Sequence, residues 1–505
     1  MKKNQKFIRN KYIILNFIVI SSVLPYFSCS SFGGIKNIGK KELEFESPNI
    51  RVERFPDTFN IKAKGPVKCS SNPCGQEEIT GTKFKSLLRD GVWEEYLEKQ
   101  EGEDPKNKLS FLSKKGKYVN GKKEGEWEEY LVKEVPNTKK NYSVLDKKGI
   151  YKDGERSGIW TYYYDEGAGR IGPKLKEANF ENGKKDGKET KFNKEGLVIE
   201  ISHYKNDLLN GEYINKTQGG LLEQEGQYLD DKKTGEWKEY HAKGKDDKLK
   251  AIINYKEDKK HGKETRYYED GKTKIAEGTF EDGLEKGPWK YFYDNGNVET
   301  EGAYIPIKAP EEPEVKDDTS SPTSTATLDV RSQVDKPKAK KIGEWKRYYK
   351  SGGLFFEGER DGKPKGTWTF YYKDGKVAAK GNMANDFMMK SGEIYDRSGN
   401  IEGKGKMRIS IFKLDPKTDD IQIKYTPDAP FVFYKNGEKH IELTDKTISG
   451  GLQAYEFSGG SKVGEGALEP ATRRKNGCWN ENGKKVYYML GKPKTGTLAK
   501  MNKCE

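Results

Sequence analysis

The feature of this sequence that most constrains its fold is a short unit that stands twice between Gly262 and Tyr304. Each copy begins with Gly-x-Trp or a variant, runs through aromatic residues to Asp-Gly or Asn-Gly, and returns as Glu-Gly-x-aromatic. Asp-Gly and Asn-Gly are strong hairpin turns, because these residues tolerate the positive φ that suits the twist of the flanking strands. Each unit therefore predicts one antiparallel β-hairpin.

Copies of this unit occupy most of the 505 residues. The glycine that opens the unit recurs with a period of about 24 residues, with longer loops in the early copies, and a period of about 20 to 50 residues indicates a repeat array. A large insertion precedes the ninth copy. The ten opening glycines are Gly91, Gly125, Gly158, Gly187, Gly211, Gly235, Gly262, Gly287, Gly343 and Gly366.

Aromatic side chains replace the large apolar core that this composition lacks. Only 32% of the residues are hydrophobic but 12% are aromatic, which suits a thin repeating sheet without a deep core. Trp stands two residues after the opening glycine, except where Glu189, Tyr213 and Glu264 replace it. A second ring follows three residues later in every copy except the one at Gly211, where Lys216 stands. Since an offset of three puts two side chains on opposite faces of a strand, we expect both faces to carry rings.

The turn that opens a copy is well seen from Gly121 to Trp127, which reads Gly-Lys-Lys-Glu-Gly-Glu-Trp. In most copies such a start is followed by Tyr-Tyr, then Asn-Gly or Asp-Gly, then Glu-Gly-x-Tyr. This pattern, matched again by Lys259-Lys-His-Gly262, resembles the MORN-repeat variant of bacterial proteins, which also occurs in a family named after toxin–antitoxin antitoxins. The resemblance covers residues 85–385. It implies an elongated array of β-hairpins that serves as a scaffold or binding surface, and it supplies no catalytic residues.

The first residues predict export. Residues 1–11 are basic, residues 12–27 are mostly apolar, and Ser28 precedes Cys29, which is the order of a secretory signal with a small residue before the cut. The apolar run is shorter than the roughly 20 residues of a transmembrane helix, although an uncleaved anchor is the alternative. Ser28-Cys29 resembles the end of a bacterial lipobox, which implies a lipid on Cys29. Several acyl chains on this cysteine would anchor the protein stably in a membrane.

The remaining four cysteines fall into two local pairs, Cys69 with Cys74 and Cys478 with Cys504. Export into an oxidising compartment makes two disulfides the leading interpretation. Free or partly reduced thiols are one alternative. A four-cysteine zinc site is another, but it would require the two ends of the chain to meet, and the sequence has no Cys-x-x-Cys spacing.

These signals predict an all-β fold, an elongated array of antiparallel hairpins with a small β-rich C-terminal unit. Residues 306–341 are rich in Pro, Ser, Thr and charge, so they form either a surface loop or a hinge between two parts of the array. The division of the chain is 1–28 lipoprotein signal peptide, 29–80 lipidated cysteine, tether and N-terminal cap, 81–305 repeat array, 306–341 linker or inserted loop, 342–390 further repeats, and 391–505 C-terminal unit.

The sequence shows no catalytic constellation, and we expect no enzyme activity, no metal site and no cofactor. The Gly-rich run Gly459–Gly466 lacks the Gly-Lys-Ser/Thr end of a phosphate loop. The net charge of +14 is dispersed among nearly as many acids, so no basic stripe predicts a nucleic-acid partner. A binding surface on the array would use rings beside the core positions, unless these rings simply cover the sheet. The candidates are Tyr162, Tyr164, Tyr268, Tyr293, Tyr349 and Tyr372.

The leading functional hypothesis is a membrane-anchored lipoprotein of the bacterial cell envelope. It would act as a non-catalytic scaffold or binding protein for another macromolecule, a protein or an envelope polymer. Ser30, with no acid close behind it, favours the outer membrane. One alternative is an antitoxin-like protein that neutralises a protein partner, although an export signal does not suit the usual cytoplasmic version. A second alternative is an envelope enzyme with an unrecognised site in the C-terminal unit.

Overall fold

The computed structural model describes residues 43–47, 49–69, 87–307, 338–415, 418–448, 451–469, 474–489 and 491–494. All helical or extended structure in these ranges is β-strand, so the described residues contain no helix that could cross a membrane. Thirty-two strands form a single sheet, in which each strand pairs antiparallel with its neighbours in the sequence. The predicted all-β array of hairpins is confirmed.

The strands follow one another along the sheet in chain order. The first group is β1 (Leu43–Ser47), β2 (Ile50–Arg54), β3 (Ile61–Pro66), β4 (Gly91–Gln100), β5 (Lys108–Val119), β6 (Lys122–Val135), β7 (Lys140–Lys152), β8 (Glu155–Asp165), β9 (Ile171–Glu181) and β10 (Lys184–Phe192). The second group is β11 (Val198–Lys205), β12 (Leu208–Lys216), β13 (Leu222–Leu229), β14 (Lys232–His241), β15 (Lys248–Lys256), β16 (Lys259–Tyr267), β17 (Lys274–Glu281), β18 (Leu284–Phe292), β19 (Val298–Ile307), β20 (Lys338–Tyr348) and β21 (Leu354–Asp361). The third group is β22 (Lys363–Tyr371), β23 (Val377–Asn385), β24 (Met388–Tyr395), β25 (Ile401–Asp415), β26 (Thr418–Lys435), β27 (Glu438–Ile448), β28 (Gly451–Ser458), β29 (Ser461–Glu469), β30 (Arg474–Glu481), β31 (Lys484–Met489) and β32 (Lys492–Lys494).

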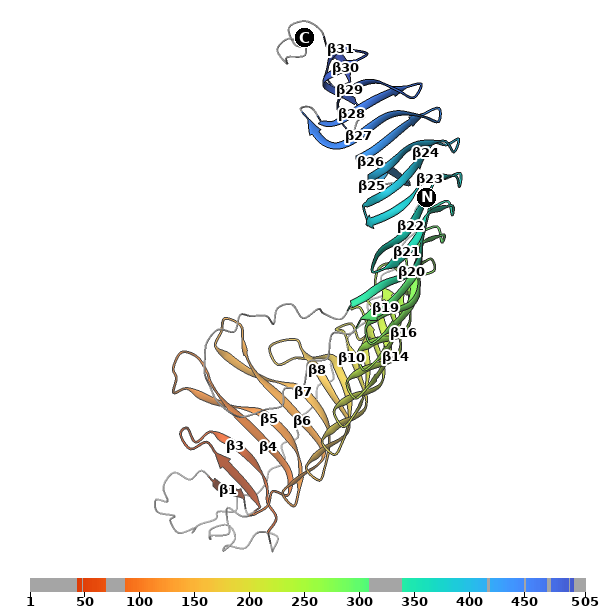
Figure 1. Cartoon of the computed structure of the whole chain (residues 1–505). Coiled ribbons are helices and arrows are strands. Elements are labelled where there is room, and N and C mark those ends of the chain that lie inside the picture. The colour runs from red at the N-terminus through yellow and green to blue at the C-terminus, as the bar shows by residue number, and fades with distance from the viewer. Residues whose placement is uncertain are drawn as a thin grey trace, which may run out of the picture.

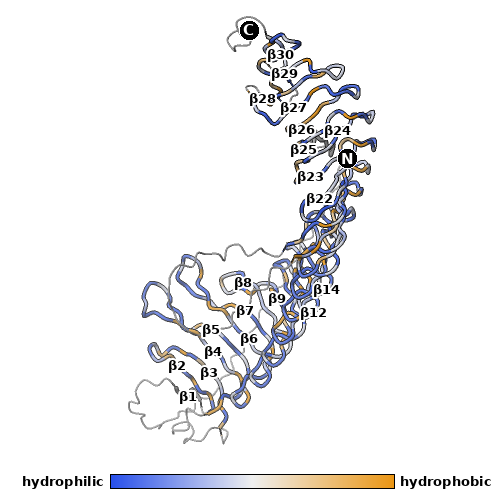
Figure 2. Tube along the Cα trace, in the orientation of Figure 1, coloured by the Kyte–Doolittle hydropathy of each residue, from blue (hydrophilic) through white to orange (hydrophobic). Residues whose placement is uncertain are grey.

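The sheet is elongated and curved, and its N-terminal end is broad (Figure 1). Strands β4 to β9 have 10 to 14 residues, whereas β10 to β13 have only 8 or 9. Hydrophobic and hydrophilic residues alternate at short intervals along the described strands (Figure 2), as expected of strands with one buried side. The strands β4 to β9, here called the broad end, therefore offer a wider face than the neighbouring strands β10 to β13.

The hairpin turns have the backbone that Asn-Gly and Asp-Gly predict. Between β5 and β6, Asn120 has a φ of 50° and Gly121 a φ of 83°, and Asp153 and Gly154 repeat this geometry between β7 and β8 with 52° and 92°. Positive φ at both central residues defines a type I′ turn, whose twist matches that of the flanking strands. The dipeptides therefore fix where each hairpin reverses.

A contact between Trp and Gly recurs along the array. All eight Trp side chains are at most 3% exposed. A Cβ added to Gly226 would lie closer than 3.0 Å to the Trp237 ring, and the other Trp residues have equivalent glycines. These are Gly65, Gly116, Gly149, Gly278, Gly302, Gly358 and Gly466. The glycine of Glu-Gly-x-aromatic is thus required because an indole ring occupies the space of a side chain.

The indole rings and the rings of the Gly-x-aromatic positions lie on the same face of the sheet, here called the indole face. They form ladders of ring contacts along it. Tyr118 contacts Trp93 and Trp127 edge-on at centroid distances of 6.3 and 5.0 Å, and Tyr151 continues the ladder to Trp160 at 5.1 Å. The buried indole N–H groups donate to backbone carbonyls, as Trp127 does at 3.0 Å. Edge-to-face ring pairs, with the indole N–H groups hydrogen-bonded, supply the buried contacts of this single sheet, which has no second layer in the described residues.

Lysine and arginine side chains cover many of these rings. Lys123 Nζ lies 4.2 Å from the ring centroid of Trp127, and Lys233 Nζ lies 3.9 Å from that of Trp237. Each lysine stands four residues before its Trp. A cation over an indole contributes about 0.5 to 2 kcal/mol, depending on its desolvation. Each such Trp is therefore held between a glycine and a cation.

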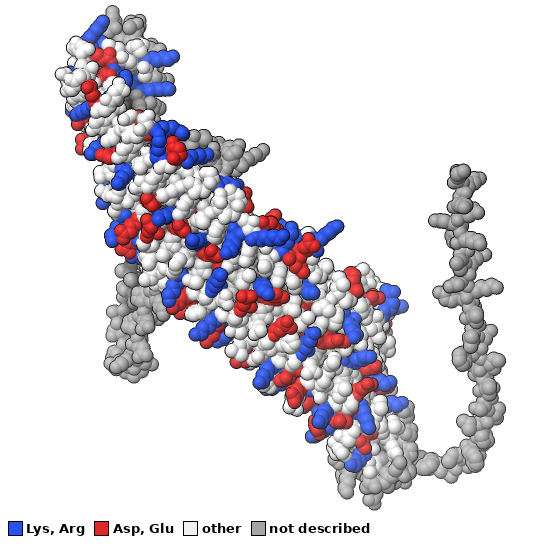
Figure 3. Space-filling view, turned by 90° about the vertical axis from the view of Figure 1, so that its right-hand side faces the viewer, with Lys and Arg blue, Asp and Glu red and all other residues white. Residues whose placement is uncertain are grey.

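The opposite face carries a row of charges that alternate in sign from strand to strand. Each strand contributes one residue to this row, and each of these residues lies directly across from the one on the neighbouring strand. In β4 to β7 the row is Glu94, Lys115, Glu128 and Lys148. The alternation returns in β17 to β21 with Glu277, Lys290, Glu301, Lys346 and Glu357. Opposite charges across neighbouring strands contribute roughly 0.2 to 1 kcal/mol each. Acidic and basic side chains are correspondingly interspersed along the surface in Figure 3.

The array begins earlier than the sequence predicts. Residues 29–80 are expected to hold a tether and a cap, but residues 43–66 contain β1, β2 and β3, and Gly65 receives the ring of Trp93. A tether and cap outside the array is therefore the wrong prediction for residues 43–66. The period search misses them because β1 to β3 carry neither a Trp nor a Gly-containing turn.

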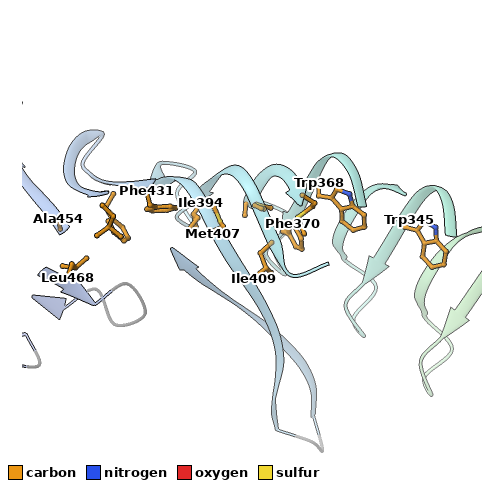
Figure 4. Packing of buried hydrophobic residues seen from close by; sticks show 14 of the residues in the cluster. Trp345, Trp368, Phe370, Ile394, Met407, Ile409, Phe431, Ala454 and Leu468 are labelled. Atoms are coloured by element: carbon orange, nitrogen blue, oxygen red, sulfur yellow. The ribbon is translucent and has the colours of Figure 1, made fainter. Parts of the chain in front are cut away.

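The sheet also continues beyond the predicted array. Strand β19 pairs with β20 up to Ile307 opposite Lys338, so the sheet is unbroken on both sides of residues 308–337, as a surface loop requires. Buried residues from Trp345 onward lie in line under the bent strands (Figure 4) and belong to one cluster that reaches Trp479. The predicted C-terminal unit thus extends the same sheet, and Gly466 with Trp479 repeats the contact of the array.

Candidate functional site

The three copies that lack Trp also lack the glycine that would receive it. The residue across from each replacement has a side chain, so the space that an indole would occupy is filled from both strands. The three pairs are Ala178–Glu189, Ser202–Tyr213 and Ile253–Glu264. Two of these copies place a carboxylate on the indole face, whereas Tyr213 keeps a ring there, with its centroid 5.3 Å from that of Tyr228 and 5.8 Å from that of Trp237.

Both carboxylates are buried ion pairs. Glu189 and Glu264 are each 2% exposed. Glu189 lies 2.7 Å from Lys185 and 3.2 Å from Lys176, and Glu264 lies 2.9 Å from Lys260. Burial opposes the charge of Glu189, but the two ammonium groups outweigh it and lower its pKa. In these copies the cation four residues earlier neutralises an acid and also lies over a ring, Lys185 at 4.2 Å from the centroid of Tyr204 and Lys260 at 5.0 Å from that of Phe280. Both ion pairs therefore belong to the packing of the sheet.

A groove of about 380 Å³ opens on the indole face over β3 to β7, at the broad end. Glu95 and Glu129 stand two residues after Trp93 and Trp127 and therefore share their face. We call it the broad-end groove; its polar lining includes Lys62, Arg89, Glu95, Lys114, Glu129, Asp146 and Lys147, and its apolar lining includes Leu97 and Leu131.

The two glutamates of the broad-end groove have matching partners. Glu95 accepts hydrogen bonds from Arg89 at 2.8 Å and from the Tyr118 hydroxyl at 2.6 Å. Burial, together with the hydrogen bond to Glu95, raises the pKa of Tyr118 above its usual range. A tyrosine hydroxyl that stays protonated can continue to donate to the carboxylate. Glu95 is therefore engaged within the sheet.

Glu129 repeats this arrangement one copy later. It accepts a hydrogen bond from the Tyr151 hydroxyl at 2.8 Å and lies 3.3 Å from both Lys147 and Arg156. Burial opposes its charge, but these three partners outweigh burial and lower the pKa of Glu129. Burial, helped by Glu129, raises the pKa of Tyr151 to about 12. Both glutamates are thus charged groups whose charge the sheet already compensates.

Two lysines that line this groove, Lys62 and Lys114, and Lys123 beside it are not paired with a carboxylate of the described residues. Within the described part of the chain, Lys62, Lys114 and Lys123 have no carboxylate oxygen within 4.0 Å. Lys123 lies over the rings of Trp127 and Tyr151, at 4.2 and 4.7 Å from their centroids. Burial, followed by the nearby charge of Lys114, lowers the pKa of Lys123. The broad-end groove therefore presents excess positive charge.

The structure gives most of the predicted tyrosine candidates a structural contact. Five of them donate their hydroxyl to a backbone carbonyl of the next copy at 2.6 to 2.9 Å: Tyr164, Tyr268, Tyr293, Tyr349 and Tyr372. Tyr293 and Tyr349 are buried, and none of the six falls in the exposed class. Tyr162 packs against the cluster of the broad end. Their use in binding a partner stays a prediction, and these contacts favour the interpretation that they cover the sheet.

The cysteine predictions fall largely outside the described residues. Cys29, Cys74 and Cys504 are not among them, so the lipid and both disulfide pairings stay predictions. Across the ranges described above, no group of three or more His, Cys, Asp or Glu side chains is placed to hold a metal ion.

Sequence reasoning missed the broad-end groove, although a signal was present. The pentapeptide Trp-Glu-Glu-Tyr-Leu occurs twice without change, at residues 93–97 and 127–131, in the first two copies. Its second glutamate and its leucine supply lining residues of the groove from β4 and β6. An exact repeat within an otherwise variable array marks these two copies as a pair.

Comparisons with known proteins add little to this picture. No protein-family model and no curated protein matches the sequence. Among solved structures, a chain of the Photorhabdus luminescens Tc holotoxin pore matches with 10% sequence identity and a TM-score of 0.12. The match covers 89% of this chain and 26% of that chain, and a likeness at this TM-score carries no argument about fold or function.

Proposed function

We propose that this protein is a non-catalytic scaffold of the bacterial cell envelope that binds another macromolecule. The observation that carries the proposal is the single unbroken sheet of 32 strands, which offers one long face supported only by contacts along its own length. Repeat architectures of this kind serve as extended binding surfaces because their stability needs only neighbouring copies.

The repeated side chains support this proposal by what they do in the sheet. On one face Trp contacts Gly and the covering cations, and on the other face the alternating charges lie across from one another, so these residues build the platform. Selectivity would then come from side chains that differ between copies, as at the broad-end groove. The resemblance to the MORN-repeat variant supports the same role, since such repeats are usually scaffolds or binding surfaces.

The anchor is the second part of the proposal. A lipid on Cys29, after removal of residues 1–28, would hold the protein to a membrane, with the outer membrane favoured by Ser30. Disulfides Cys69–Cys74 and Cys478–Cys504 would form in the same exported environment. The sheet would then extend from the membrane surface into the envelope.

Two measurements on the full-length protein test this proposal. In fractionated cells, we expect the wild-type protein with the membranes and the Cys29→Ala variant in the soluble envelope fraction; retention of the variant in membranes contradicts the lipid anchor. After chemical cross-linking in intact cells, we expect the protein to be recovered with a macromolecular partner at fixed stoichiometry. Recovery of the uncross-linked chain alone, at every cross-linker concentration, contradicts the binding role.

A further inference from the structure

The broad-end groove carries positive charge that no described acid neutralises. Its three acidic lining residues are engaged, since Glu95 and Glu129 have the partners given above and Asp146 pairs with Lys147 at 3.1 Å. Arg89 is likewise held by Glu53 and Glu95, each at 2.8 Å. The excess charge of the lining therefore lies on the ammonium groups of Lys62 and Lys114, with Lys123 beside them. A desolvated anion beside such groups would gain more than it could in open water.

Two of the three cations are held in place by the sheet. Lys114 lies in β5, with Glu95 across from it in β4 and Glu129 across from it in β6, on the same face. Lys123 is fixed by its two ring contacts and interacts electrostatically with the same three residues. The strand pairing thus sets where Lys114 stands in the groove, and the ring contacts hold Lys123 beside it before any ligand arrives.

Apolar walls accompany the charge. Leu97 in β4 and Leu131 in β6 are 49% and 41% exposed, and both line the groove. Their strands are separated by β5, so the two side chains stand roughly 9 to 10 Å apart across the face. A large apolar side chain of a ligand could lie between them and remove both leucines from water, at about 25 cal/mol per Å² buried.

The backbone hydrogen-bonding groups of the strands beneath the groove are already paired. Strands β3 to β7 are paired with each other across its floor, so a ligand on this face cannot add itself as a further strand. Recognition must therefore use the side chains: ammonium groups for anions and leucines for an apolar group. At about 380 Å³, the space suits a few residues of an extended chain and not a folded domain.

We propose that the broad-end groove binds an extended peptide segment in which carboxylates flank a large apolar side chain. The carboxylates pair with Lys62 and Lys114, and the apolar side chain lies between Leu97 and Leu131. This inference rests on the proposed binding function and names the chemistry of the partner at one site. It also assigns a role to the repeated Trp-Glu-Glu-Tyr-Leu pentapeptide, whose two copies form the two walls.

The test uses the full-length protein and synthetic peptides. The probe is a fluorescent, capped five-residue peptide with four acidic residues around a central leucine, and fluorescence anisotropy reports its binding. One comparison peptide carries the matching amides, and another carries glycine in place of leucine. We expect both comparison peptides to bind at least about tenfold more weakly than the probe, and we expect the affinity of the probe to fall as salt increases.

A pair of variants locates the site. Lys62→Gln with Lys114→Gln should weaken binding of the probe about tenfold or more, because both are groove cations without a structural partner. The matched control is Lys232→Gln with Lys256→Gln, which removes the same charge from a second groove of about 330 Å³ at the turn between β13 and β14. This control should leave the affinity unchanged. Far-UV circular dichroism checks that both double variants keep the sheet.

Several results would overturn the inference. These are equal binding of the amide peptide, equal loss of affinity in both double variants, or displacement of the probe by inorganic phosphate at the probe's own concentration. The last result would show a simple anion site without peptide selectivity. The proposed function can fail separately: a partner cross-linked in cells while the probe does not bind refutes only the ligand class. Tight probe binding without any partner in cells refutes the scaffold role instead.

Discussion

The contact between Gly226 and Trp237 allows a sharp test of how this sheet is held together. We consider the substitution Gly226→Ala, which adds a single methyl group. That carbon would lie closer than 3.0 Å to three atoms of the Trp237 ring, a separation that packed carbon atoms do not reach. The backbone of Gly226 is not in the positive-φ region, so a change in stability would report the ring contact and not backbone strain.

The magnitude follows from what must move. Inserting one methyl group into a filled site costs about 1 to 3 kcal/mol when the surroundings can shift. If Trp237 has to leave its place, the loss approaches the roughly 3 to 5 kcal/mol of truncating a buried Trp. The ring is 1% exposed, accepts Lys233 over its face and donates to the Gln227 carbonyl at 3.1 Å, so little room remains for it to shift. We therefore expect a loss of about 3 kcal/mol.

Amide hydrogen exchange is the suitable assay, because a long repeat array unfolds locally and global two-state unfolding does not describe it. Protection of amides in β13 and β14 should fall about a hundredfold, since each 1.4 kcal/mol is a factor of ten. The control Gly219→Ala adds a methyl group whose nearest neighbour is the Thr217 hydroxyl at 3.8 Å, and it should change protection little. In the Trp237→Glu background, Gly226→Ala should cost less than about 1 kcal/mol, because the pair then matches Ala178–Glu189. An equal cost in both backgrounds, or an equal cost at Gly219, would refute the reasoning.

Three further predictions address other parts of the sheet. The folded-state pKa of Glu189 is lowered, so its contribution to stability is present above the usual glutamate pKa of about 4.3 and is lost as the pH falls through the folded value. The exchange protection of β9 to β11 should therefore drop over that acid range. The drop should be less steep in the Glu189→Gln variant, which has no carboxylate to protonate. Tyr349→Phe removes the 2.7 Å hydrogen bond to the Tyr371 carbonyl and should cost about 1 kcal/mol in local exchange. The control Tyr434→Phe, at a hydroxyl that makes no hydrogen bond within the described residues, should change little. Replacing residues 308–337 by Asn-Gly should leave circular dichroism and thermal stability unchanged, because Ile307 and Lys338 already face each other; a large loss of stability would favour the hinge interpretation.

The periodic part of the fold could be predicted because each local signal has a direct physical cause. Asn120 and Gly121 tolerate the positive φ of a type I′ turn, and the spacing of Gly and Trp fixes a hairpin period. The sequence alone did not show why the second glycine recurs. Its role depends on which residue lies across from it, and register becomes visible only when the strands are paired. Once the strands are paired, Ala178 is found across from Glu189, where the other copies place a glycine across from a Trp. The glycine is not needed there because no indole ring occupies the space of its side chain.

The predictions about binding residues were harder, for the same reason. The tyrosines that follow the ring position looked available in sequence, but Tyr293 and Tyr349 are buried and donate to the backbone of the next copy. Exposure cannot be inferred from a repeated position, because the neighbouring copy decides it. The broad-end groove, in contrast, lies where two successive copies share the pentapeptide that contains Glu95 and Glu129, and this identity was visible in the sequence.

The central claim is that the sheet is a platform whose partner binds at the broad-end groove. Site-specific photo-crosslinking in living cells tests it most directly, with the crosslinker placed at Leu131 on the groove wall or at Leu229 on a distant turn edge. Both positions are exposed, at 41% and 56%, so accessibility alone does not separate them. The account predicts a discrete macromolecular adduct at Leu131 that is absent at Leu229 and lost in the Lys62→Gln, Lys114→Gln background. The same adduct from both positions, or from neither, would contradict it.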